Sequence, residues 1–170
     1  MIVRRESPDD VAIVRDIVSA AFNRGDGEEP METRLLDELR TCSGWIPAMS
    51  LVAMNNQRVV GHAVCTRGFV GDLECVGLGP IAVDPATQRI GIGLALMHTM
   101  LGVLDGLDEP LVALLGSPEY YSRYGFVPSN TVGIHPPDPQ WGDYFQVRTL
   151  SSFDPRTCGT FKYAEPFDRL

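Results

Sequence analysis

The chain has 170 residues, of which 44% are hydrophobic and 21% charged, and its formal net charge is −8. This composition is typical of one ordinary globular domain over residues 1–170, and the acidic balance argues against a nucleic-acid partner, which needs a basic face to neutralise phosphates. No apolar run reaches the roughly 18 residues of a membrane span and no signal-peptide pattern is present, so we expect a cytoplasmic protein without a membrane partner.

Hydrophobic periodicity predicts the elements of the first half in the order strand, helix, helix, strand, strand, strand. Their approximate ranges are residues 2–5, 8–22, 32–40, 50–54, 59–69 and 74–83. Ser7 and Pro8 supply a start signal for the first helix. Polar turns join the last three strands, which is the pattern of an antiparallel meander.

The second half predicts a long apolar helix, a buried strand, a short helix and two late strands. Their approximate ranges are residues 91–104, 111–115, 119–124, 144–150 and 160–163, and a proline-rich segment extends to Pro139. The strand over 111–115 is continuously apolar, as expected where both faces of a sheet are covered. The order of elements predicts the α+β (mixed α/β) class.

The four cysteines show no spacing typical of a metal site. Cys42, Cys65, Cys75 and Cys158 contain no CxxC pair, and no histidine lies near them in a zinc pattern. Reduced thiols, mostly buried, are therefore expected, and no metal site is predicted.

The most informative segment follows the apolar strand that ends at Val83. A short turn and two glycines, Gly91 and Gly93, lead directly into the long helix, with Arg89 just before them. A helix start offers free backbone N–H groups, glycines allow close approach, and arginine adds a permanent positive charge. A diphosphate is the natural ligand of such a turn, although a tight strand-to-helix turn without any ligand has the same pattern.

Two nucleotide motifs are excluded by the residues that follow the second glycine. A Walker motif requires Lys and then Ser or Thr there, whereas the chain has Leu94 and Ala95. The dinucleotide fingerprint requires a third glycine, and Leu96 occupies that position.

The run from Ile81 to Pro85, followed by Gln88-Arg89-x-Gly91-x-Gly93, resembles the acetyl-CoA motif of the GNAT superfamily of N-acetyltransferases. The stretch from Leu115 to Phe126 resembles the strand-helix-"GF" element that closes the cofactor site of this family. The late Gly159-Thr-Phe-Lys-Tyr163 and Phe167 are similar to the tail of a small bacterial subgroup. The resemblance implies the GNAT fold: a central mixed, twisted sheet of about six or seven strands, flanked by about four helices and splayed around the acyl-CoA site.

The resemblance also implies that acetyl-CoA is the co-substrate and that no metal takes part. The pantetheine arm would lie between the strand ending at Val83 and the strand over 111–115, and the diphosphate would rest on the glycine turn. Gly79-Pro80 marks a bulge that frees backbone groups for the arm, because proline does not fit a central ladder. The residues that the resemblance assigns to the cofactor are Ile81, Ala82, Val83, Arg89, Ile90, Gly91, Ile92, Gly93 and Leu94.

Tyr121 is the candidate acid for the departing thiolate, since similar enzymes carry a tyrosine five residues before the phenylalanine of the "GF" element, here Phe126. A phenol suits this role because its reference pKa of about 10 exceeds the roughly 8.5 of a thiol. The alternative is that Tyr121 only packs against Tyr120 and Tyr124.

The general base stays open at the level of sequence. Many relatives carry a glutamate four residues before the position of Ile81, where this chain has Gly77. Glu74 is the nearest substitute, and a solvated charge at the strand end is the alternative for it. Glu32 faces the acceptor side in related folds and is the candidate ligand of a substrate amine, with an ordinary exposed helix acid as the alternative.

The sequence therefore predicts an N-acetyltransferase that moves an acetyl group from acetyl-CoA to a primary amine by direct attack in a ternary complex. The acceptor is a small-molecule or peptide amine, and a homodimer is a further possible assembly. One alternative is a catalytically silent GNAT-fold sensor or scaffold that binds acyl-CoA, because a fold alone does not establish turnover. Another is an α/β protein that binds a different diphosphate at the glycine turn.

Overall fold

The structure, a computed structural model, describes residues 1–169. Its strands are β1 Ile2–Arg5, β2 Trp45–Asn55, β3 Arg58–Val70, β4 Leu73–Val83, β5 Leu111–Leu115, β6 Val127–Pro128, β7 Ile134–His135, β8 Phe145–Thr149 and β9 Gly159–Lys162. Seven of them cross the sheet in the order β1-β2-β3-β4-β5-β8-β6, and β9 and β7 extend from β3. The β4–β5 and β7–β9 pairs are parallel and the others antiparallel, so the predicted mixed sheet is confirmed.

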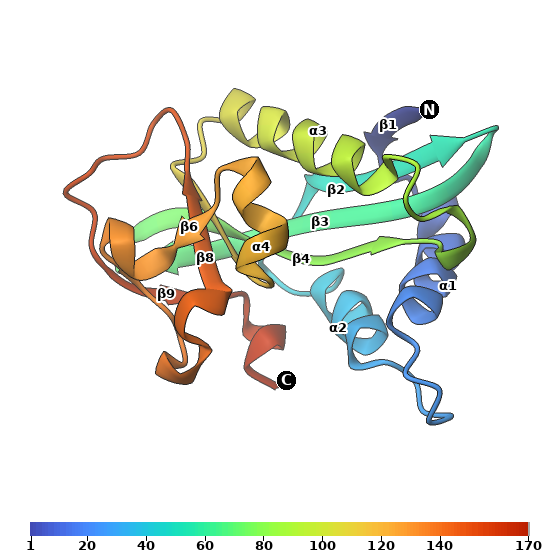
Figure 1. Cartoon of the computed structure of the whole chain (residues 1–170), viewed down its shortest axis with the longest axis horizontal. Helices are drawn as coiled ribbons and strands as arrows, with labels where there is room; N and C mark the ends of the chain where they lie inside the picture. Colours follow the sequence, from blue (N-terminus) through green and yellow to red (C-terminus); the bar gives the residue numbers. More distant parts are fainter. Residues whose placement is uncertain (170) are drawn as a thin grey trace.

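The helices cover both faces of this sheet (Figure 1). They are α1 Val11–Phe22, α2 Met31–Leu39, α3 Ile92–Gly106 and α4 Pro118–Tyr121. Short 3₁₀ helices lie at Pro8–Asp10, Pro85–Thr87, Ser122–Tyr124, Ser129–Val132, Pro139–Tyr144 and Glu165–Arg169. Figure 1 shows α3 on one side of the strands and α1 and α2 on the other.

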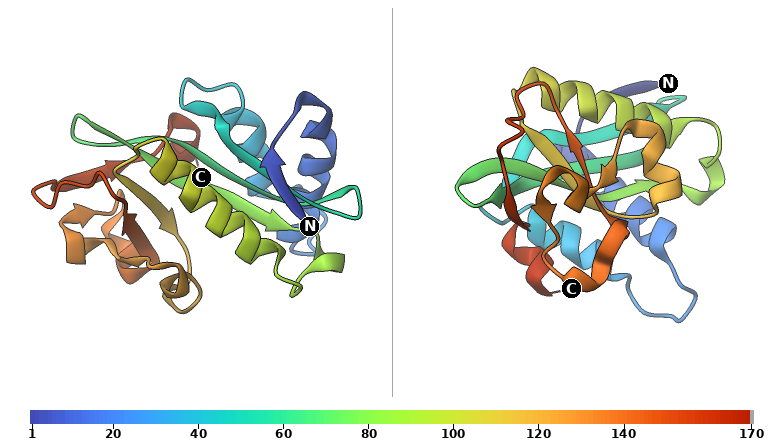
Figure 2. Two further views of the ribbon diagram at one scale, coloured as in Figure 1. Left: turned by 90° about the horizontal axis from the view of Figure 1, so that it is seen from above. Right: turned by 60° about the vertical axis from the view of Figure 1, so that its left-hand side comes forward.

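The alternation of side chains along β2 explains this layering. Leu51 and Ala53 belong to the core cluster formed with α3, whereas Val52 packs with Val14 of α1 and Leu36 of α2. Successive residues of a strand point to opposite faces, so one strand supplies both cores. In the left view of Figure 2 most of the C-terminal third of the chain lies at the end of the sheet that contains β5, whereas its last turn, Glu165–Arg169, packs beside α2.

The sequence prediction was incomplete in two segments. The strand predicted over residues 50–54 is longer than expected: β2 begins at Trp45, with a register shift before Ser50 that accommodates Pro47. The proline-rich segment after Gly125 contains β6, β7 and 3₁₀ turns rather than a plain loop. Strands of two residues have no hydrophobic period, so periodicity alone does not reveal them.

Among the described residues, no helix combines the length and apolarity needed to cross a membrane. Residues 1–169 likewise place no three His, Cys, Asp or Glu side chains together as a metal site. Cys65 and Cys75 are buried, whereas Cys42 is half-buried and Cys158 is exposed, so the expectation of mostly buried thiols was right for two of the four.

A buried polar cluster ties the end of β1 to α2, β2 and β3. Glu6 pairs with Arg40 at 2.6 Å and accepts a hydrogen bond from the Ser50 hydroxyl, which lies 2.9 Å from His62 Nε2. Burial alone would raise the pKa of Glu6, but His62, whose Nε2 lies 3.6 Å from Glu6, and the hydrogen bonds from Ser50 and Arg40 outweigh it and lower that pKa to about 2. Burial also lowers the pKa of His62.

This cluster predicts a loss of stability in acid. A carboxyl whose pKa is lower in the folded chain stabilises it fully above its unfolded value of about 4.5, and this contribution disappears as pH falls toward 2. We expect the free energy of unfolding to drop by on the order of 2 kcal/mol between these pH values. His62 adds a second loss that begins at higher pH: below about pH 6.5 the imidazole takes up a proton in the unfolded chain more readily than in the folded one, which favours unfolding. Urea titrations from pH 7 to pH 3 measure both losses. Glu6→Gln should flatten the lower part of the profile, whereas the exposed Asp9→Asn control should not; an unchanged profile in Glu6→Gln would contradict the assignment.

Candidate active site

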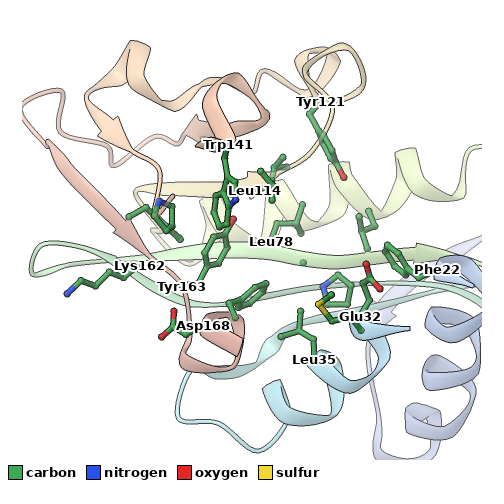
Figure 3. A pocket seen from close by; sticks show the side chains of 18 of the residues that line it. Phe22, Glu32, Leu35, Leu78, Leu114, Tyr121, Trp141, Lys162, Tyr163 and Asp168 are labelled. Carbon is green, nitrogen blue, oxygen red and sulfur yellow. The ribbon is translucent and has the colours of Figure 1, made fainter. Parts of the chain in front are cut away.

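Two clefts meet where β4 and β5 diverge. The smaller, of about 610 Å³, runs along the end of β4 to the start of α3. The larger, of about 960 Å³, lies between α2, β4 and the C-terminal segment (Figure 3). Phe22, Ile81 and Tyr121 line both clefts and mark their junction.

The divergence begins immediately after Gly77. The parallel pairing of β4 with β5 is limited to Val76 with Val112 and Gly77 with Ala113. Beyond it, β4 continues to Val83 and keeps β3 as its only strand partner within residues 1–169. The β3–β4 register shifts by one residue between Leu78 and Ile81, so the bulge predicted at Gly79-Pro80 is present.

The free edge of β4 exposes the backbone groups of Ile81 and Val83. The Asp84 N–H donates to the Val60 carbonyl at 2.9 Å, and directly opposed residues of an antiparallel pair alternate between bonded and non-bonded. Ala82 therefore bonds to β3, while the peptide groups of Ile81 and Val83 point toward the diverging β5. The Val83 carbonyl instead accepts a hydrogen bond from the Gln88 side chain at 3.3 Å.

At the far end of the smaller cleft, α3 presents an open N-terminus. Arg89 and Gly91 both have left-handed backbone conformations, with φ of 66° and 91°, and these turn the chain sharply into the helix. The first helical bond is the one from the Ala95 N–H to the Gly91 carbonyl at 3.0 Å. The N–H groups of residues 92–94 therefore donate to no acceptor within residues 1–169, and a 15-residue helix adds its positive dipole there.

Gly93 has no side chain, so the space between the start of α3 and Tyr120 stays open to a ligand. A Cβ there would lie 3.3 Å from the Tyr120 hydroxyl. The Arg123 guanidinium lies over the Tyr120 ring, 4.9 Å from its centre, and lines the same cleft as Arg89. Two arginines and three free amides thus surround one end of the smaller cleft, which is the chemistry that recognises a diphosphate.

Of the nine residues assigned to the cofactor from sequence, the structure brings eight together along the smaller cleft. Ile90 does not line it and is 60% exposed. Sequence reasoning missed Gln88 and Arg123, which also line it. Gln88 lies inside the motif and could have been found there, whereas Arg123 reaches the cleft only because the short helix after β5 folds back over α3.

Tyr121 lies at the junction of the two clefts. Its ring packs edge-on against Tyr120 and Phe126, with ring centres 4.9 and 5.9 Å apart. Its hydroxyl makes no hydrogen bond within residues 1–169, and Figure 3 shows it pointing into the cavity. Burial, and secondarily the neighbouring Tyr120, raise the pKa of Tyr121 to about 12, so the phenol keeps its proton at neutral pH.

Gly116 positions this tyrosine. A Cβ at Gly116 would lie 2.3 Å from Cε2 of Tyr121, so Gly116→Ala must displace the ring. The sequence predicts that Tyr121 is the acid of an acetyl transfer, and a small displacement of such a group is costly; this prediction implies a loss of at least about tenfold in kcat for Gly116→Ala with CoA binding retained. Steady-state kinetics and calorimetry measure the two effects. Gly102→Ala on α3, which meets no atom within 4 Å, is the matched control and should keep full activity.

The structure shows why no longer side chain fits at Gly77, the position where the family resemblance implies a glutamate. A Cβ at Gly77 would lie 2.6 Å from two ring atoms of Tyr163, so the C-terminal segment fills the space that a longer side chain would need. Glu74, the substitute base proposed from sequence, lies three residues earlier, where its side chain is 68% exposed and 3.7 Å from Arg67. It lines neither cleft, so the structure does not support Glu74 as a base.

Glu32, by contrast, lines the larger cleft. Its side chain is 25% exposed, and its Oε2 atom is buried without a hydrogen-bond partner among the described residues. Asp168 and Lys162 also line this cleft, and most of the remaining wall is apolar or aromatic. Asp168 was not anticipated, because nothing in the local sequence indicates that the last turn folds back to α2.

An apolar slot that leads from a free strand edge to a cationic helix start defines a site for a long ligand that carries a diphosphate. Residues 3–128 match the family model of an acetyltransferase (GNAT) domain. The chain is therefore a member of the GNAT acetyltransferase family, and its fold is the GNAT fold.

Relatives agree with this membership. YhbS of Escherichia coli K12, an uncharacterized N-acetyltransferase, is 28% identical over 100% of both chains. YjhQ of the same strain, also an uncharacterized N-acetyltransferase, is 32% identical over 70% of this chain, and the match spans 65% of its own length.

Solved structures show the same similarity. A GNAT family acetyltransferase from Brucella melitensis in complex with acetyl-CoA has a TM-score of 0.79 and 31% identity, covering 98% of this chain and 97% of that one. Escherichia coli YhbS in complex with CoA has a TM-score of 0.86 and 26% identity, covering 99% of this chain and 92% of that one.

Proposed function

We propose that this chain transfers the acetyl group of acetyl-CoA to a primary amine by direct attack within a ternary complex. The observation that carries the proposal is the meeting of the two clefts at Ile81 and Tyr121. One cleft has the shape and charge for the CoA chain, and the other is open to an acceptor. The CoA or acetyl-CoA bound to the two structural neighbours supports this choice of acyl carrier.

The residues of the smaller cleft suit CoA. The free amides of residues 92–94, with Arg89 and Arg123, would hold the diphosphate. The Ile81 carbonyl and the peptide groups of Val83 would pair with the amides of the pantetheine arm as an added strand does. Acetyl-CoA would supply the activated acetyl carbon and a thiol as leaving group.

The groups at the junction divide the chemistry between them. An amine must lose its ammonium proton before it attacks, and water in the open cleft takes that proton in this scheme. The Ile81 N–H stabilises the negative charge that develops on the carbonyl oxygen. As the nitrogen–carbon bond forms and the carbon–sulfur bond breaks, the Tyr121 hydroxyl gives its proton to the sulfur. The proton that the nitrogen then releases restores Tyr121.

A sensor or scaffold that binds acyl-CoA without turnover is the competing function, and Gly77 in place of a glutamate is the observation that favours it. Release of free thiol from acetyl-CoA, measured with a panel of primary amines, tests the proposal. Amine-dependent thiol release at a saturable rate supports transfer. Calorimetric binding of CoA without thiol release on any amine would leave the silent binder as the function. ATP should not displace CoA, because the slot along β4 selects for the pantetheine arm.

A further inference from the structure

The larger cleft has the carboxylate of Glu32 at one end and a group of aromatic rings at the other. Glu32 and Phe22 lie at one end, and Trp141, Tyr163 and Lys162 lie at the other (Figure 3). Phe22 belongs to both clefts, so the end that contains Glu32 is the one next to the proposed site of acyl transfer.

Glu32 has the properties of an ammonium ligand. Its buried Oε2 has no hydrogen-bond partner within residues 1–169, and the other oxygen lies 3.9 Å from Arg24, whose side chain is 67% exposed. A carboxylate oxygen left unpaired in a partly buried site gains most from a ligand that is positively charged and donates hydrogen bonds.

The opposite end offers flat apolar surface. The Tyr163 and Phe167 rings are stacked with centres 4.5 Å apart, and Trp141 meets Tyr163 edge-on at 6.4 Å. Rings arranged in this way pack well against another ring. Lys162 and Asp168, one charge of each sign, also line the cleft, so the far end gives no net attraction to a second ammonium.

We propose that the acceptor is an arylalkylamine, that is, a primary monoamine joined through a short carbon chain to an aromatic ring. This inference rests on the proposed function of the site. The ammonium pairs with Glu32 beside the junction, and the ring packs on Trp141, Tyr163 and Phe167. Polyamines lack the ring and bring a second ammonium to an end where Lys162 offsets the charge of Asp168, and a peptidyl amine brings polar backbone to walls with few hydrogen-bonding groups.

The first test compares acceptors on the wild-type protein with acetyl-CoA, by thiol release. Phenethylamine and tryptamine should show kcat/KM values at least about 30-fold above those of propylamine, putrescine and spermidine, since a buried ring adds strongly to binding. Equal or higher values for the polyamines, or for a lysine-containing peptide, would overturn the inference.

The second test uses variants at the two ends of the cleft. Glu32→Gln should raise KM for phenethylamine about 10- to 100-fold without changing the Kd for CoA, because it removes only the charge. Trp141→Ala should reduce the preference for phenethylamine over propylamine about tenfold. Asp16→Asn on α1 and Tyr144→Ala, whose side chains are exposed and line neither cleft, are the matched controls.

Calorimetric titration of phenethylamine into the CoA complex tests the proposed acceptor class separately from the proposed acetyl transfer. Binding that Glu32→Gln abolishes supports the acceptor class even if no turnover occurs, in which case catalysis alone fails. Turnover of other amines together with no binding of phenethylamine would reject the acceptor class and leave acetyl transfer intact. Circular dichroism verifies that each variant is folded.

Discussion

Replacing Tyr121 with phenylalanine should lower kcat about 100-fold while KM for acetyl-CoA stays within about twofold, the signature of a group that acts only in the transition state. The ring contacts with Tyr120 and Phe126 remain in this variant, and only the hydroxyl at the junction is lost. The departing sulfur then leaves as a thiolate without a proton donor. Steady-state thiol release with the best acceptor measures the effect.

The pH dependence of the wild-type rate is a second measurement that bears on Tyr121. Because the pKa of Tyr121 is raised to about 12, this group should impose no alkaline limit on the wild-type rate in the usual assay range. Tyr144→Phe, a change in an exposed ring outside both clefts, is the control. Full turnover in Tyr121→Phe would show that the ring serves only packing.

Reversing the charge of Arg89 should weaken CoA binding about 10- to 100-fold. Arg89 stands in a left-handed turn immediately before the open start of α3, where its charge and the helix dipole act on the same anion. A glutamate there repels the diphosphate, and a surface interaction of this kind is weakened by salt. Calorimetric titrations at about 50 and 500 mM salt should therefore show a smaller difference between wild type and Arg89→Glu at the higher concentration.

Arg58→Glu is the matched control for this experiment. Arg58 is exposed at the start of β3 and lines neither cleft, yet the change in net charge is the same. Equal weakening in both variants would mean that the overall field, and not the helix start, attracts the ligand. No weakening in Arg89→Glu would remove this residue from the site.

The smaller cleft, which is the proposed cofactor site, was largely predictable from sequence because its parts are local. The strand end, the turn and the helix start form one continuous stretch from Ile81 to Leu94, and the positions of glycine and arginine follow directly from the free amides of a helix N-terminus. The bulge at Gly79-Pro80 was also predictable, since proline cannot fill a place in a central ladder.

The larger cleft, which is the proposed acceptor site, was much less predictable because residues far apart in the chain form it. Nothing near Gly77 indicates that Tyr163 fills the space above it, and nothing near Glu32 indicates that Asp168 shares its cavity. Glu74 was an attractive base only because of its sequence distance from Gly77, whereas the pairing of β4 places it at the opposite end of the strand from the junction. Contacts of the C-terminal segment determine both the space left at Gly77 and the residues that share the cleft with Glu32.

A crystal structure of the protein with bound CoA tests the central claim most directly. The diphosphate oxygens should lie within hydrogen-bonding distance of the amides of residues 92–94, with the pantetheine arm along Ile81 and Val83 and the sulfur next to Tyr121. A CoA molecule bound elsewhere, or one whose sulfur lies far from the junction of the two clefts, would contradict it.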